Sequence, residues 1–231
     1  MKKTLLLLLT LFTIYSCDIQ YDGETRIVVQ GQVVDKDNNP IADKRIEINT
    51  HSSSDYVGSD LISFTNTDSE GKFTLIFPSP KSDEIDIVTT INGSYEIDYQ
   101  NIQTPTSGYQ SKSIRATKRN FANYKLDFNK IVLYKSEEIT ELEVALNQTS
   151  NNKQITDIHI EGNSAENFID LKKEDENKNQ YLKTLFDVAK NQNLKLSYSI
   201  RDFSNPANVV ISQHEAIVTI NSEKVIHTIT Y

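Results

Sequence analysis

The feature that most constrains the fold of this chain is the alternation of apolar and polar residues across residues 26–77. Every second residue is apolar in residues 72–77, and the same period of two runs through residues 26–34 and 45–49. Between these runs, residues 35–40 read Asp-Lys-Asp-Asn-Asn-Pro and residues 68–71 read Asp-Ser-Glu-Gly, which are residue types that tight turns require. The pattern predicts short antiparallel strands with one buried face, packed as a β-sandwich.

The same stretch resembles the carboxypeptidase regulatory-like domain, a transthyretin-like β-sandwich of many bacterial envelope proteins. The matching motifs are Gly31-x-Val33-x-Asp35, Asn39-Pro40-Ile41, Arg45-Ile46-Glu47-Ile48 and Thr67-Asp68-Ser69-Glu70-Gly71-Lys72-Phe73. The chain departs from the family in Asp43-Lys44-Arg45, where small residues are common, and in a longer loop before Leu61. The resemblance covers residues 27–134 and implies a domain over residues 26–135 that acts as a spacer, docking module or transporter accessory.

The N-terminus has the pattern of a secretory signal peptide over residues 1–16. Lys2 and Lys3 precede an apolar run that is shorter than the ~20 residues needed to span a bilayer. Cys17, the only cysteine, follows this run and resembles the lipobox cysteine of a bacterial lipoprotein precursor, which implies its acylation, for example with palmitate. The alternative is an ordinary signal peptide with an incidental cysteine. We expect residues 17–25 to form a polar, lipidated tether, and we expect no disulfide.

The N-terminal region also bears on the net charge of the mature chain and on its location in the cell. The formal charge of −8 becomes −10 when Lys2 and Lys3 are removed, and an acidic chain is poorly suited to bind nucleic acid. The membrane is therefore expected to be reached through the lipid on Cys17. Acidic residues soon after this cysteine resemble a surface-display signal in one group of bacteria and an inner-membrane retention signal in enteric bacteria. We favour an outer-membrane lipoprotein at the cell surface over a periplasmic one.

The rest of the first domain is expected to hold one further hairpin and a long polar segment. Asn92-Gly93, between alternating runs at residues 85–91 and 94–102, is a strong signal for a tight type I′ turn. Residues 103–123 are interpreted as a polar loop, and their basic cluster either is solvated or faces an acidic glycan or partner. This cluster consists of Lys112, Arg115, Lys118 and Arg119. Residues 124–134 are predicted to form the last strand of the domain.

Residues 136–231 carry a second series of alternating runs separated by polar turns. Six or so strands with no convincing long helix predict an immunoglobulin-like or fibronectin-like sandwich. Residues 181–189 fit either a short helical face or a strand, and we favour the strand because a polar turn and a clear strand follow. The predicted fold is therefore all-β, with two tandem antiparallel β-sandwich domains after a lipoprotein signal peptide.

Motifs for catalysis or for cofactor and metal binding are missing from the sequence. The histidines at positions 51, 159, 214 and 227 have no zinc-ligand spacing, and neither an HExxH motif nor a Gly-x-Ser-x-Gly elbow is present. Residues 35–39 are rich in oxygen ligands, but they lack the distal glutamate of a calcium-binding EF-hand, and turn chemistry explains them. We predict no catalytic residue, no metal and no cofactor.

Four residues are the candidates for ligand contacts. Asp55 and Tyr56 lie in residues 50–60, a loop longer than a hairpin needs, and such loops often bind ligands on rigid scaffolds. Tyr109 and Arg115 lie in the polar segment that follows. The alternatives are a mobile loop without a ligand and a tyrosine half buried in a sheet.

These observations predict a non-catalytic cell-envelope lipoprotein that docks on a protein partner in the outer membrane or at the surface. A surface protein that binds glycans or host proteins is the alternative. A hydrolase of unrecognised type is the third hypothesis, and it would need acid and base residues that converge on a pocket.

Overall fold

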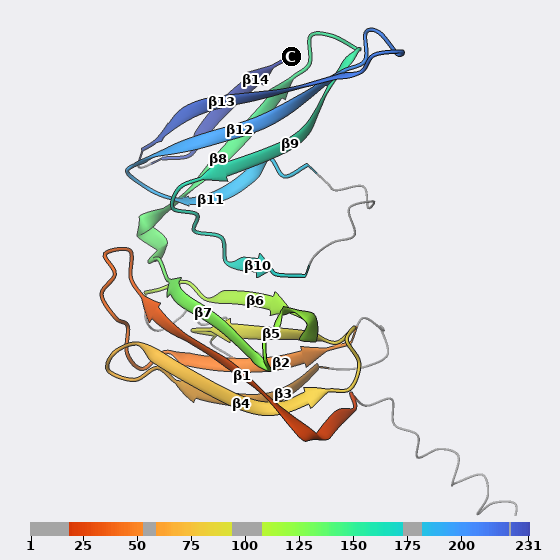
Figure 1. Ribbon diagram of the computed structural model, residues 1–231. Helices are drawn as coiled ribbons and strands as arrows, with labels where there is room; N and C mark the ends of the chain where they lie inside the picture. The colour runs from red at the N-terminus through yellow and green to blue at the C-terminus, as the bar shows by residue number, and fades with distance from the viewer. Residues whose placement is uncertain (1–18, 53–58, 94–107, 173–181, 222) are drawn as a thin grey trace, which may run out of the picture.

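A computed structural model describes residues 19–52, 59–93, 108–172, 182–221 and 223–231. Within these ranges the regular structure consists of fourteen β-strands and two short 3₁₀ helices, arranged in four sheets (Figure 1). Each half of the chain packs two sheets around its own apolar core. The prediction of an all-β chain with two sandwiches is confirmed.

The first sandwich packs a three-stranded sheet against a five-stranded sheet. The three-stranded sheet has the order β4 (Lys72–Pro80), β1 (Tyr21–Val34) and β7 (Lys125–Val132). The five-stranded sheet has the order β10 (Phe168–Asp170), β6 (Lys112–Ala116), β5 (Asp86–Ile91), β2 (Arg45–His51) and β3 (Ser59–Asn66). The faces predicted from the alternation are buried, as Ile27, Phe77 and Ile46 illustrate. Apolar residues fill the core, and the polar residues between them point outward.

The second sandwich is built from two three-stranded sheets. One has the order β11 (Leu185–Ala189), β8 (Ile139–Asn147) and β14 (Val225–Thr230). The other has the order β13 (Val210–Ile220), β12 (Gln192–Asp202) and β9 (Lys153–Glu161). Leu142, Leu194 and Leu196 are fully buried between the sheets. The strand favoured within residues 181–189 is confirmed over Leu185–Ala189.

Three strand pairs are parallel, although the sequence predicted antiparallel sandwiches. In both sandwiches the last strand lies parallel to the first, β7 beside β1 and β14 beside β8. Strand β10 is also parallel to its neighbour β6. Turn residues between consecutive runs reveal hairpins, whereas these pairs join strands that are far apart in sequence. The alternation could therefore predict the strands but not these neighbours.

The first strand begins earlier than predicted, at Tyr21 instead of residue 26. Tyr21 pairs with Pro80, its hydroxyl is hydrogen-bonded to that of Thr50 at 2.7 Å, and the preceding Ile19 is buried. The tether predicted over residues 17–25 therefore ends by residue 20. Because the residues between Tyr21 and Arg26 are mostly polar, the alternation gave no sign that they extend the strand.

The polar segment after residue 103 is not wholly a loop, because Lys112–Ala116 forms β6 and Lys118–Asn120 forms the 3₁₀ helix η1. Lys112 occupies an inward-facing position in line with buried Ile114, which hid the strand pattern. Residues 94–102, the predicted partner in the Asn92-Gly93 hairpin, lie outside the described residues. Asn92 itself has the positive φ of 56° that such a turn uses.

The two sandwiches are joined twice. The direct connection runs through the 3₁₀ helix η2 (Ser136–Glu138), beside a small cluster of Tyr134, Ala165 and Ala189. The second connection is β10, which lies within the residues expected to form the second sandwich but pairs with β6 of the first (Figure 1). Strand β10 therefore belongs to a sheet of the first sandwich, although β9 before it and β11 after it belong to the second.

Candidate functional site

A groove of about 700 Å³ lies on the outer face of the five-stranded sheet. In β2, β5 and β6 alternate residues are buried in the core, so the residues between them face this groove. Its size is within the ~300–1,000 Å³ typical of ligand sites. The lining residues are Arg45, Glu47, Asn49, His51, Ser59, Leu61, Asp86, Val88, Thr90, Ser113, Arg115 and Phe168.

One part of the groove contains a buried carboxylate. Glu47 is only 5% exposed, and its Oε1 accepts a hydrogen bond from Arg45 Nε at 2.5 Å. These residues are two apart on β2, which places both side chains on the same face. The Arg45 guanidinium also lies 4.4 Å from the centre of the Phe64 ring. The pair offsets the buried charge and fixes the direction of both polar groups.

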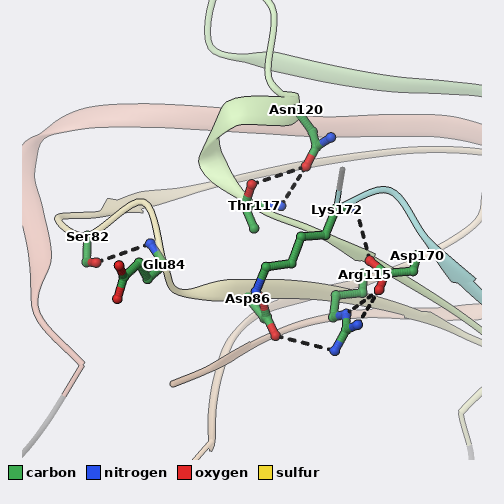
Figure 2. Close-up of polar contacts among 8 residues, drawn as sticks. All are labelled: Ser82, Glu84, Asp86, Arg115, Thr117, Asn120, Asp170 and Lys172. Carbon is green, nitrogen blue, oxygen red and sulfur yellow. Dashed lines mark hydrogen bonds and ion pairs between the residues drawn. The ribbon is translucent and has the colours of Figure 1, made fainter. Parts of the chain in front are cut away.

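Arg115 forms the centre of an ion-pair network on the same sheet. Its Nε donates to Asp170 Oδ2 at 3.1 Å, and a second nitrogen lies 3.6 Å from Asp86 Oδ2 (Figure 2). The Lys172 ammonium lies 3.4 Å from the other oxygen of Asp86. The hydrogen bond from Arg115 holds the pKa of Asp170 below its ordinary value. The network links β6, β5 and β10 through charged side chains.

Backbone and amide contacts also hold β10 in place. Ser113 N donates to Asn167 O at 2.7 Å, and Leu171 N donates to Arg115 O at 2.8 Å. Nδ2 of Asn120, the last residue of η1, donates to Leu171 O at 2.7 Å. Because β10 carries Phe168, these contacts position the aromatic side chain of the groove. The groove is therefore assembled from both halves of the chain.

Of the four predicted contact residues, the structure places Arg115 in the groove. Tyr109 lies outside the set of lining residues, half-buried against the first core, with the ammonium groups of Lys44 and Lys135 each 5.6 Å from its ring centre. Asp55 and Tyr56 lie outside the described residues, as does Cys17. The structure therefore does not bring Tyr109 and Arg115 together.

Sequence reasoning missed most of the groove. Glu47 and Asn49 were recognisable as outward-facing positions of a predicted strand, but nothing in the sequence indicated that a groove forms on this face. Phe168 gave no usable signal, because it reaches the first sheet from the other half of the chain. The site depends on a long-range strand pairing that the turn pattern does not encode.

The predicted basic cluster is not an open positive patch. Lys112 is buried, and burial lowers the pKa of its ammonium while the Glu166 carboxylate opposes that shift. Lys118 and Arg119 lie 3.8 Å and 4.0 Å from the carboxylate of Asp83. Acidic side chains therefore offset much of the charge of the cluster, Arg115 included, although Lys118 and Arg119 share the one carboxylate of Asp83.

The described part of the chain lacks two further features. It holds no group of three or more histidine, cysteine, aspartate or glutamate side chains placed to bind a metal ion. Its helices include none with the length and apolar character needed to cross a membrane.

Comparisons with known proteins give remote structural likenesses. No family model matches the sequence, and no match to a curated protein was found. A shaft pilin of Lactobacillus rhamnosus GG is 9% identical, with a TM-score of 0.33, over 88% of this chain and 97% of the pilin. A tip fimbrial protein of Porphyromonas gingivalis is 8% identical, with a TM-score of 0.29, over 82% of this chain and 81% of that protein.

An enzyme also resembles part of the chain. The 3-chlorocatechol 1,2-dioxygenase of Rhodococcus opacus is 14% identical, with a TM-score of 0.32, over 51% of this chain and 64% of the enzyme. The chain thus matches just under two thirds of the enzyme's length. At such low similarity these likenesses say nothing about function.

Proposed function

We propose that this chain is a non-catalytic interaction module of the bacterial cell envelope. In this proposal it is anchored in the outer membrane by lipid on Cys17, is displayed at the cell surface, and binds a protein partner in the groove of the five-stranded sheet. The observation that carries the proposal is the groove itself, an open hollow of about 700 Å³ on the outer face of the five-stranded sheet. The signal-like N-terminus and lipobox support the envelope location.

The arrangement of charges in the groove suits recognition. Arg45 is paired with Glu47, and Arg115 is paired with Asp86 and Asp170, so each charged group is held in a fixed direction. A partner that binds such a surface meets ordered hydrogen-bonding groups and loses less side-chain entropy on binding. Opposite charges side by side also favour a partner with a matching pattern over one of uniform charge.

The test is a comparison of two arginine substitutions in the full-length protein. Val88→Arg places a long charged side chain in the groove, whereas Ile76→Arg places the same side chain at an exposed position of β4 in the other sheet. Both variants and the native protein are crosslinked in intact cells, and the adducts are quantified by mass spectrometry. The proposal predicts an adduct that survives Ile76→Arg and falls about tenfold with Val88→Arg, as for a disrupted hot spot.

Equal adducts from both variants would place the partner elsewhere on the molecule and contradict the proposal. Thermal unfolding of each variant checks that neither substitution unfolds the sandwich.

A second candidate function is glycan binding in the same groove, and one observation favours it. Phe168 is 47% exposed and lines the groove together with residues that can hydrogen-bond to sugar hydroxyls, including Asn49 and Thr90. Calorimetry against a panel of neutral and acidic polysaccharides tests this with Phe168→Ala and, as a matched control, Tyr124→Ala at an exposed position in the turn before β7. Glycan binding predicts that the heat of binding is lost with Phe168→Ala alone. If the native protein gives no heat of binding with any polysaccharide of the panel, these glycans are ruled out as ligands.

A further inference from the structure

Strand β13 presents a long sheet edge without the usual protection against pairing. It ends the sheet β13-β12-β9 and pairs with β12 through eleven successive residue pairs without a bulge. In the part of the chain that the structure describes, no strand pairs with its other side. Residues 210–220 contain neither lysine, arginine nor proline, and Ile211 and Ile217 are 63% and 68% exposed. Natural sheets seldom leave such an edge open to another chain.

The other edge strands carry protective features. β3, β7 and β9 each adjoin a register shift in the ladder with their neighbour, and β4 contains Pro78 and Pro80. β10, β11 and β14 are short, with three, five and six residues. Bulges, prolines and short lengths all discourage the addition of a further strand. With eleven residues, β13 is therefore the longest described edge that has neither a bulge nor a proline.

The side chains of β13 match a second copy of themselves in one antiparallel register. If His214 lies opposite His214 of the copy, Ile211 lies opposite Ile217 and Gln213 opposite Glu215, all on the outer face. Exposed apolar residues then meet twice across the two-fold axis, which is a favourable cross-strand arrangement.

Charge also favours this register over its neighbours. Glu215, the single charged residue of β13, is already paired with Lys195 at 2.7 Å. A shift of the copy by two residues in one direction would place Glu215 opposite Glu215 of the copy, and the same shift in the other direction would place it opposite Ile211. Like charges, or a charge facing an apolar side chain, make both shifted registers poorer.

We infer that β13 is the contact by which two copies of this chain associate, with His214 opposite His214, so that their three-stranded sheets join into one. The inference is independent of the groove and of its partner. Antiparallel addition of one edge to another is a known mode of protein association, and its affinity comes from main-chain hydrogen bonds.

The register is tested by cysteine crosslinking of the full-length protein in native membranes. In the inferred pairing the two residues at position 214 have Cα atoms about 4.5–5.5 Å apart, which a disulfide can bridge. Residues at position 212 are offset by about 13 Å along the strand and cannot be bridged. His214→Cys is therefore expected to give about tenfold more reducible dimer than the matched Ser212→Cys. The native protein, with Cys17 alone, sets the background.

A lysine at the edge tests the apolar contact. Ile217→Lys, combined with His214→Cys, is expected to abolish the crosslinked dimer, because it puts an unmatched charge opposite Ile211. Ile226→Lys, at an exposed position of the other sheet edge, is the control and should leave the dimer unchanged. Either equal dimer from Ser212→Cys and His214→Cys, or no dimer above the native background, would overturn the inference. An adduct whose mass is not twice that of the chain would place a different protein at this edge and also overturn it.

Discussion

The two sandwiches close in the same way but complete their edges differently. In each, the last strand lies parallel beside the first, although the two halves share no sequence repeat. The five-stranded sheet of the first sandwich ends in β10, which the second half supplies. The second sandwich leaves the long β13 open. A strand at the edge of a sandwich can therefore be supplied from outside that sandwich, as β10 is for the first one, whereas no described segment covers β13.

If the shared closure stabilises both units, truncating a buried residue in either closing strand should have a similar and large effect. Ile131→Ala in β7 and Ile229→Ala in β14 remove side chains that are buried in the two cores. We expect each to lower the free energy of unfolding by about 2–5 kcal/mol, through lost burial and the cavity left behind. Urea unfolding measures both. A loss below about 1 kcal/mol in one variant alone would show that the closures are not equivalent.

The borrowed edge strand depends on Arg115. Arg115→Met removes its ion pairs with Asp86 and Asp170, and we expect β10 to detach more readily, at a cost of about 1–2 kcal/mol after allowance for solvent screening. Hydrogen exchange at the amides of Ser113 and Leu171 reports this locally. Arg119→Met, which removes an arginine that is mostly exposed beside Asp83, is the matched control and should leave both amides protected. Equal exchange in the two variants would mean that the backbone alone holds β10.

The pH dependence of the same contact is smaller and has a definite sign. Because Arg115 lowers the pKa of Asp170 from 3.8, the carboxylate stabilises the folded state above that value. This contribution should be lost as the pH falls below 3.8 and through the lower pKa of the folded state. Exchange of the Leu171 amide should therefore accelerate in this range. Asp170→Asn should already exchange faster at neutral pH and should lack this acid-induced change, and an unchanged profile would contradict the assignment.

The smallest effect on stability is expected in the groove. Asn49→Ala changes an outward-facing side chain, and we expect the free energy of unfolding to change by less than about 0.5 kcal/mol. The yield of the crosslinked adduct with the proposed partner should nonetheless fall in Asn49→Ala. Thermal unfolding and quantitative crosslinking on the same sample separate the two effects, and a large loss of stability would instead give Asn49 a structural role.

The sequence was sufficient where the fold depends on local pattern. Alternation correctly placed Ile27 and Phe77 in the core, and the strand preferred over a helix near Phe186 is present. Polar strands were missed where the alternation was concealed, as in β6, whose inward-facing Lys112 is charged. In such strands tertiary contacts outweigh residue type.

The candidate site was less predictable than the fold. The sequence predicts Arg115 as a contact residue in a basic loop, whereas the structure places it on a strand and pairs its charge with Asp86 and Asp170. Phe168 enters the groove through pairing between halves of the chain, which no local signal reports. Residues that act together across such distances can be recognised only once the strand order is known.

The most direct test of the groove as the binding surface is site-specific photocrosslinking in living cells. A photoreactive amino acid replaces Thr90 in the groove or, as a matched position, the exposed Thr74 on β4. The proposal predicts a discrete adduct from position 90 and none of that mass from position 74. Adducts from position 74 alone, or the same adduct from both positions, would contradict it.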